Sequence, residues 1–208
     1  AGGVFWLTVA VTQAQFLNYS GLAALLTSNH FHFAGFSAVT VSARLLLAAP
    51  KNRWLKISTL GLIIGLPSVA MGITLAGTDA SYRSLEMIAA LGESAALFCL
   101  GCGSVQFAKS SENLIGFPRF GFLIVGVSAC IASLLSTAFC LRGFAALDQG
   151  WLTAMVIGHG SLNLLGVSLG GLYLVGALPT EPSDSLQRFN DSDRTSGAVS
   201  PGEIGRKE

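Results

Sequence analysis

Three histidines and one glutamate stand inside long apolar runs of this sequence. His30 and His32 belong to the stretch NHFHFAGF, His159 belongs to GHGSLNLLG, and Glu93 lies near the middle of another apolar run. Ionisable side chains are costly to bury in apolar surroundings, and those that lie within a membrane usually mark functional sites. These four residues are therefore the candidates for chemistry.

Imidazole and carboxylate groups allow several kinds of chemistry. Together they form a ligand set for zinc, non-haem iron, manganese or copper, and two imidazoles from different helices can bind a haem axially. The same groups can relay protons or form the coupling site of a transporter. A structural interpretation is also open, in which each side chain hydrogen-bonds across helices and holds a bundle together. The candidate ligands of a transition metal ion or haem are His30, His32, Glu93 and His159.

Two asparagines accompany the histidines. Asn163 follows His159 by four residues and shares its helix face, where its amide could orient the imidazole or meet a ligand. His30 and His32 point about 200° apart on a regular helix. Either one of them faces the bundle centre, or the helix is distorted at Asn29, or the two serve different neighbours. We expect His32 to face the shared site, because small residues follow it.

The amino-acid composition indicates whether water or lipid surrounds the protein. Apolar residues make up 51% of the chain and charged residues 11%, and the mean hydropathy is +0.63. A soluble domain carries about 25% charged residues, so this sequence indicates a polytopic membrane protein. With a net charge of +1 and no dense cluster of Lys and Arg, nucleic acid is excluded as a partner. The expected partners are the lipid bilayer, other membrane subunits, or a small ligand between helices.

A helix that crosses a bilayer needs roughly 20 mainly apolar residues, and by this measure the sequence contains six spans. They cover about residues 3–17, 22–49, 55–76, 84–107, 120–141 and 151–178, of which the first is short and partly polar. From residue 179 the chain turns polar, which is typical of disorder. The sequence thus predicts an all-α transmembrane bundle over 1–178 and a disordered cytoplasmic tail over 179–208.

Small residues within the spans indicate how the helices pack. Gly61 with Gly65, and Gly166 with Gly170, have the GxxxG spacing that lets helices approach closely. Cys99 and Cys102 form a CxxC, but at helical spacing among apolar residues they are better read as small packing residues. The hydroxyls of Ser133, Ser136 and Thr137 can hydrogen-bond within their own helix.

The basic residues predict the orientation. Lys51, Arg53, Lys56, Lys109 and Arg119 fall on one side of a six-span topology, which the positive-inside rule places in the cytoplasm together with both termini. The second, fourth and sixth spans then all run inward from the outer side. The three histidines and Glu93 lie about 8 to 10 residues into these spans, roughly 12 to 15 Å deep at about 1.5 Å per residue. The four side chains should therefore share one layer.

The blocks HFHFAGF (30–36) and HGSLNLLG (159–166), with Glu93 in a helix between them, resemble the YndJ-like family of bacterial membrane proteins. The resemblance covers most of the region from the second to the sixth span and implies an integral protein of the inner membrane. Family members are longer at the N-terminus. The second block is also similar to the HxHLNLLGW pattern of haem-binding membrane proteins, except that Gly158 and Ser161 stand where another His would be expected.

Two features of the chain's start belong with this resemblance. The chain lacks an initiator Met, which suggests a trimmed or partial chain, and Ala1 opens into apolar residues without the basic region of a cleavable signal peptide.

The sequence as a whole predicts a membrane protein with an intramembrane His/Glu site that binds a metal ion or haem. The alternatives are a transporter of a small solute, ion or proton, and an accessory subunit of a larger membrane complex.

Overall fold

The computed structural model describes residues 2–14, 21–111, 114–141 and 149–178. These residues form helices and the turns between them, without a strand in the described ranges, and the helices lie in one compact unit, Ala1–Gly176. The prediction of an all-α fold is confirmed. The predicted tail, 179–208, lies outside the described residues, so the division of the chain at residue 178 stays a prediction.

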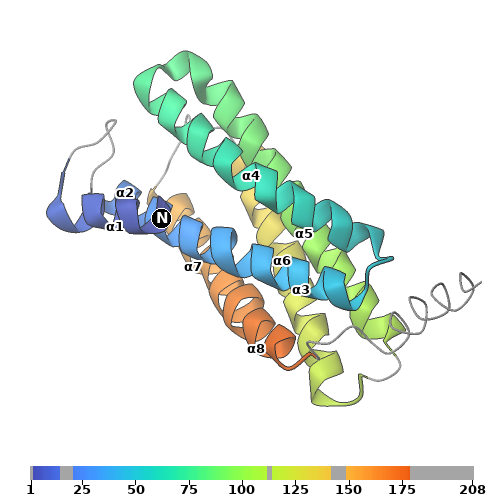
Figure 1. The fold of residues 1–208 in the computed structure, drawn as a ribbon. Coiled ribbons are helices and arrows are strands. Elements are labelled where there is room, and N and C mark those ends of the chain that lie inside the picture. Colours follow the sequence, from blue (N-terminus) through green and yellow to red (C-terminus); the bar gives the residue numbers. More distant parts are fainter. Residues whose placement is uncertain (1, 15–20, 112–113, 142–148, 179–208) are drawn as a thin grey trace, which may run out of the picture. The chain divides into compact units, whose positions relative to one another are not determined.

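Two of the helical runs are composite (Figure 1). The first run joins α2 (Gly21–His30), the π-helix η1 (Phe31–Ala38) and α3 (Val39–Ala48). The last joins α7 (Gln149–Ser161), the π-helix η4 (Leu162–Gly170) and α8 (Gly171–Gly176). The remaining elements are α1 (Gly2–Thr12), α4 (Arg53–Thr78), the 3-10 turn η2 (Ala80–Tyr82), α5 (Arg83–Ser110) and α6 (Phe117–Leu141).

Within the described residues, four helical segments are long and apolar enough to cross a membrane. They are Thr27–Ala48, Arg53–Thr78, Ala80–Ser110 and Phe117–Leu141, and they match the second to fifth predicted spans. The run 149–176 is helical over most of the predicted sixth span. Helix α1 has 11 residues, too few for the roughly 20 that a bilayer requires. The apolar helices thus indicate a membrane protein.

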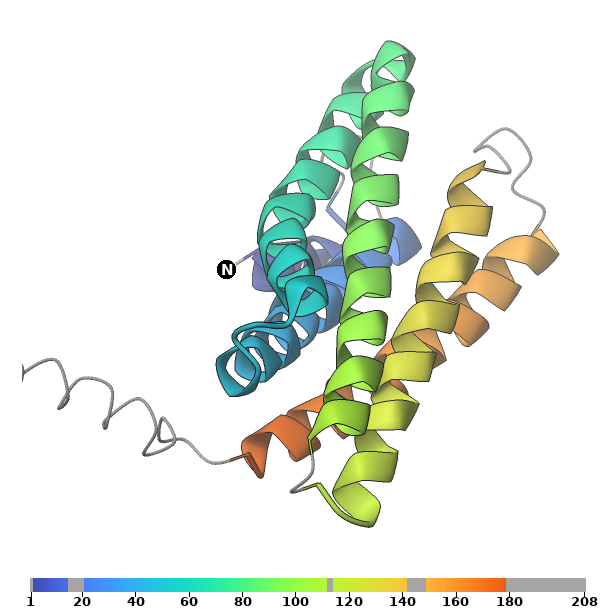
Figure 2. The same ribbon diagram turned by 90° about the vertical axis from the view of Figure 1, so that its right-hand side faces the viewer.

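The long helices form a closed ring of neighbours. Helix α4 packs along α5 over most of its length, and α5 packs along α6 (Figures 1 and 2). On the other side, α6 contacts η4, η4 contacts η1, and α3 contacts both α4 and α8. Five helical runs therefore surround a common centre, while α1 packs on α2 and η1 outside it.

The predicted GxxxG glycines lie mostly at helix contacts. A methyl group added at Gly61 would lie 2.7 Å from the Cβ of Ala96 on α5, and one added at Gly65 would lie 3.3 Å from the Cβ of Glu93. A methyl added at Gly166 would collide with the side chain of Ser128 on α6. One added at Gly170 would instead approach the Leu165 carbonyl of its own run, at 3.2 Å.

The turns at the two ends of α4 are held by side-chain caps. The Asn52 Oδ1 accepts hydrogen bonds from the backbone N–H groups of Trp54 and Leu55, at 3.0 and 3.3 Å, and its Nδ2 donates to the Gly103 carbonyl of α5 at 3.2 Å. At the far end, the Asp79 carboxylate accepts from the Ser81 N–H at 2.8 Å. That hydrogen bond holds the pKa of the Asp79 carboxyl below its usual value.

Candidate functional site

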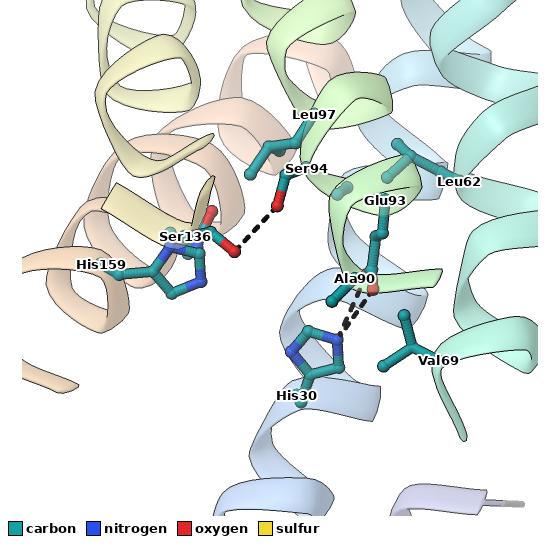
Figure 3. A pocket seen from close by; sticks show the side chains of 11 residues that line it. His30, Leu62, Val69, Ala90, Glu93, Ser94, Leu97, Ser136 and His159 are labelled. Atoms are coloured by element: carbon teal, nitrogen blue, oxygen red, sulfur yellow. Dashed lines mark hydrogen bonds and ion pairs between the residues drawn. The ribbon is translucent and has the colours of Figure 1, made fainter. Parts of the chain in front are cut away.

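A cavity of about 70 Å³ lies at the centre of the ring of helices (Figure 3). Each of the five helical runs contributes to its wall. The residues of interest that line it are His30 at the end of α2, Glu93 on α5, His159 on α7 and Asn163 on η4. The wall is otherwise apolar, apart from Ser94 and Ser136, and includes Leu62, Val69 and Leu97. Three of the four ionisable groups predicted to share a layer therefore meet at one cavity.

His30 and Glu93 form a direct pair between two helices. The His30 Nε2 lies 3.2 Å from each carboxylate oxygen of Glu93. Because an ionised carboxylate can only accept, Nε2 carries the hydrogen and donates to both oxygens. Glu93 is 7% exposed, while the His30 side chain remains 38% exposed. The carboxylate is therefore compensated inside the protein by a single imidazole.

The packing of α4 brings Glu93 to the cavity. Gly65 lies against the backbone and Cβ of Glu93, where an added methyl group would lie 3.3 Å from the Glu93 Cβ, a tight contact. On the other side of α5, the Ser94 hydroxyl donates to the Ser136 Oγ at 2.8 Å, and the Ser133 hydroxyl donates to the Ser94 carbonyl at 2.8 Å. Helix α5 is thus held between α4 and α6 with Glu93 facing inward.

These serine contacts join two helices. The hydroxyls of Ser133 and Ser136 can in principle bond within their own helix, but in the structure both bond to Ser94 of the neighbouring helix. Sequence reasoning missed Ser94 as a cavity residue. Its position directly after Glu93 was the available signal, because hydroxyls on membrane helices often bond across to another helix.

His159 is fixed at both ring nitrogens. Its Nδ1 lies 2.8 Å from the Ala132 carbonyl, and its Nε2 lies 2.9 Å from the Asn163 Nδ2. A carbonyl only accepts, so Nδ1 carries the hydrogen; the amide then donates to the lone pair of Nε2. His159 is therefore held as the neutral Nδ1–H tautomer, with the Asn163 amide against its Nε2.

His32 lies away from the cavity, so the expectation that it faces the shared site is wrong. It is an exposed residue whose Nδ1 donates to the Ser28 carbonyl at 2.9 Å, and its ring lies against Gly3 of α1. His30 occupies the inward position instead. The two rings diverge as their spacing predicts, and the packing of α1 on the His32 side decides which of them turns inward.

The helix is distorted near the two histidines, which was one of the alternatives for this segment, but the distortion begins after His30 and not at Asn29. Asn29 is exposed and stays within regular α2, and the chain changes to π-helix at Phe31. A second π-helical stretch begins at Leu162, directly after the turn that carries His159. The two stretches contact each other. Wide turns of this kind are rare and concentrate at functional sites, and here each one adjoins a cavity histidine.

The arrangement of these side chains gives no support to a bound metal ion or haem. In the described parts of the chain, no group of three or more His, Cys, Asp and Glu side chains is placed to hold a metal. Both nitrogens of His159 already have protein partners. The cavity of about 70 Å³ is also far below the roughly 300 Å³ at which pockets for organic ligands begin. Its size and its polar side chains instead suit a few water molecules.

Comparison with known proteins identifies one family. The family model described as YndJ-like protein matches residues 1–167, which include His30, Glu93, His159 and Asn163. Neither a curated protein nor a solved structure matches the chain.

Proposed function

The chain belongs to the YndJ-like protein family, and we propose that it is a membrane protein that carries a proton, alone or together with a small solute, through its His/Glu site. One observation carries the proposal: the His30–Glu93 pair joins two helices at a water-sized cavity inside the ring. Ionisable groups that face the interior of a membrane bundle typically belong to ion pathways and proton relays.

The pair can couple a proton to helix movement. A proton that binds Glu93 converts the carboxylate to a neutral acid and removes the charge that attracts His30. An uncompensated charge is expensive in an apolar interior, so α2 and α5 are held together in one protonation state and released in the other. A change of protonation then becomes a change in the contact between two helices, which is what a proton-coupled transporter requires.

His159 and Asn163 supply a second position for the proton. His30 and His159 point into the cavity from different sides (Figure 3), and water within the cavity could bridge them. The Nε2 of His159 becomes available to a proton only when the Asn163 amide turns away, because that amide donates to the same lone pair. Asn163 thereby acts as a positioning residue that keeps His159 neutral until it moves.

We prefer this function to metal or haem binding because too few of the candidate side chains remain without a protein partner to act as ligands. With the His159 nitrogens both engaged and His32 outside the cavity, His30 and Glu93 are the remaining donors, and they bond to each other. A partner subunit that completes the site would make the chain an accessory component of a larger complex, and co-purification of such a subunit would identify that case.

The test uses the purified protein in liposomes and the variant Glu93→Gln, which keeps the shape of the side chain but cannot take up a proton. In wild-type protein, infrared difference spectra between low and high pH should contain the C=O band of a protonated carboxyl group that Glu93→Gln lacks. Proton uptake driven by a potassium diffusion potential, followed with an internal pH dye, should fall in the same variant to the rate of protein-free liposomes.

The matched control is Glu86→Gln, in the first turn of the same helix and outside the cavity. It should leave the cavity-specific infrared band and the proton uptake unchanged. Identical infrared spectra for wild type and Glu93→Gln would rule out protonation of Glu93 and overturn the proposal. Stoichiometric metal or a Soret band that disappears in His159→Ala would replace it with the metal or haem function.

A further inference from the structure

An open groove of about 530 Å³ lies apart from the cavity, at the end of α5. Cys102, Val105, Gln106 and Lys109 line it at spacings of three, four and seven residues, so they share one face of α5. Cys130 of α6 and Trp54 in the first turn of α4 form its other walls. The proposed function uses none of these residues.

The groove changes from apolar to polar along its length. Its inner part is walled by Cys102, Val105 and Cys130, whereas its outer part carries Gln106, Lys109 and Ser110, where α5 ends. The seven residues from Cys102 to Lys109 span about 10 Å at about 1.5 Å per residue. Since Ala80–Ser110 is a candidate membrane span, this polarity runs from the depth of the bilayer to its surface. A phospholipid has the same profile, with acyl chains below and a headgroup above.

Exposed apolar side chains of α6 continue beyond the inner part of the groove. Leu134 follows Cys130 by four residues on the same helix face and is 59% exposed, and the adjacent Ile131 is 44% exposed. Because α6 runs from its start near the end of α5 toward the opposite end of the bundle, Leu134 lies deeper than Cys130. An acyl chain that enters the groove between Val105 and Cys130 therefore meets further exposed apolar side chains.

The polar end of the groove is positively charged. Lys109 forms part of its wall, and the Arg53 guanidinium lies 5.3 Å from the centre of the Trp54 ring, which is also part of the wall. The start of α4, at Asn52 and Arg53, adds the positive end of a helix dipole. Trp and Lys at the ends of membrane helices typically lie at headgroup level.

We propose that this groove binds one anionic phospholipid, with its phosphodiester headgroup at Lys109 and Trp54 and an acyl chain along Val105 and Cys130. Basic pockets between membrane helices are suited to such headgroups. The charge selects anionic over zwitterionic lipid, and the apolar depth selects a lipid over a free phosphate ion.

The test follows Trp54 fluorescence in the full chain carrying Trp6→Phe and Trp151→Phe, so that Trp54 is the only tryptophan. The protein is reconstituted in phosphatidylcholine that contains increasing amounts of one lipid with a brominated acyl chain. In one series this lipid is phosphatidylglycerol, and in the other it is phosphatidylcholine. Brominated phosphatidylglycerol should quench Trp54 at a lower mole fraction. Lys109→Gln should reduce this preference about fivefold, as expected for the loss of one lysine charge at a membrane surface.

Arg119→Gln is the matched control, because Arg119 follows the same loop but does not line the groove. It should retain the preference for phosphatidylglycerol. Equal quenching by the two lipids in the parent protein, or an equal loss in Arg119→Gln and Lys109→Gln, would overturn the proposal. If the single-tryptophan chain does not fold, native mass spectrometry of the wild type and Lys109→Gln, purified with both lipids, gives the same comparison. Retention of phosphatidylglycerol should fall in the variant, and unchanged retention would contradict the site.

Discussion

At the scale of single residues, the three histidines differ because their partners fix their hydrogens differently. His30 donates from Nε2 to the Glu93 carboxylate, whereas His32 and His159 donate from Nδ1 to the carbonyls of Ser28 and Ala132. Among the residues that the structure describes, His159 also has its second nitrogen engaged, by Asn163. His30 is thus half of a charge pair, His32 is a surface group, and His159 is neutral and accepts a hydrogen bond at Nε2.

This assignment predicts a specific spectroscopic result for His159. With histidine labelled in the ring nitrogens, solid-state NMR of the protein in lipid should find His159 in the Nδ1–H tautomer. Asn163→Leu removes the amide donor, so the Nε2 resonance should move toward that of a nitrogen without a hydrogen bond while Nδ1 keeps its hydrogen. Asn29→Leu, an exposed asparagine at the other histidine block, should leave the His159 signals unchanged. An Nε2–H tautomer in wild type would contradict the assignment.

At the scale of helices, glycines determine how closely α4, α5 and α6 approach. Gly61 and Gly65 place α4 against Ala96 and Glu93 of α5. Gly101 of α5 and Gly126 of α6 face each other so closely that a methyl group on either would lie within 2.8 Å of the other's carbonyl oxygen. Dispersion and hydrogen bonding across such close contacts hold membrane helices together. They also set the position of Glu93, because α5 lies between the two contacts.

Gly61→Ala should destabilise the bundle by about 1 to 3 kcal/mol, as overpacking of a close contact does, because its methyl group would lie 2.7 Å from the Cβ of Ala96. The reciprocal change Ala96→Gly in the same chain should restore most of the loss. The measurement is the unfolding midpoint in detergent by circular dichroism.

Gly92→Ala provides the control for helix propensity, since no atom beyond the local helix lies within 4 Å of the added methyl group. Its midpoint should stay the same or rise slightly. Failure of Ala96→Gly to rescue Gly61→Ala would mean that the contact between these two residues does not limit the approach of α4 to α5.

At the scale of the whole molecule, the ring of helices buries Glu93 and exposes apolar side chains outward. Ile63, Ile88 and Leu134 are each more than half exposed, as expected where lipid replaces water. Five of the twelve Lys and Arg residues of the sequence lie in or beside the turns at the Arg53 end of α4 and the Ser110 end of α5: Lys51, Arg53, Lys56, Lys109 and Arg119. We propose that this end faces the cytoplasm and that the protein lies in the bacterial inner membrane.

Cysteine labelling tests this orientation. In a chain whose four native cysteines are replaced by alanine, Ser81→Cys in the turn between α4 and α5 should react with a membrane-impermeant maleimide in intact spheroplasts. Ser111→Cys, at the other end of α5, should react only after permeabilisation. The opposite pattern would invert the topology, and labelling of both from outside would mean that α5 does not cross the membrane.

The sequence by itself determined the limits of most helices and the common level of three ionisable groups along them. The second to sixth predicted spans agree with the helical runs within a few residues, because about 20 apolar residues are needed to cross a bilayer whatever packs against them. The common layer of His30, Glu93 and His159 follows from the constant rise of a helix along its axis. Hydropathy and helical rise describe position along an axis, and both are properties of the local sequence.

Only the tertiary structure decided how each helix is rotated and which groups meet. His30 lines the cavity, whereas His32 lies against Gly3 of α1, and Ser94 bonds Ser136 where α5 and α6 are in close contact. The two π-helical stretches contact each other, and the Ala132 carbonyl of another helix fixes the tautomer of His159. Rotation about a helix axis leaves hydropathy and depth unchanged, so only packing against neighbouring helices can select it.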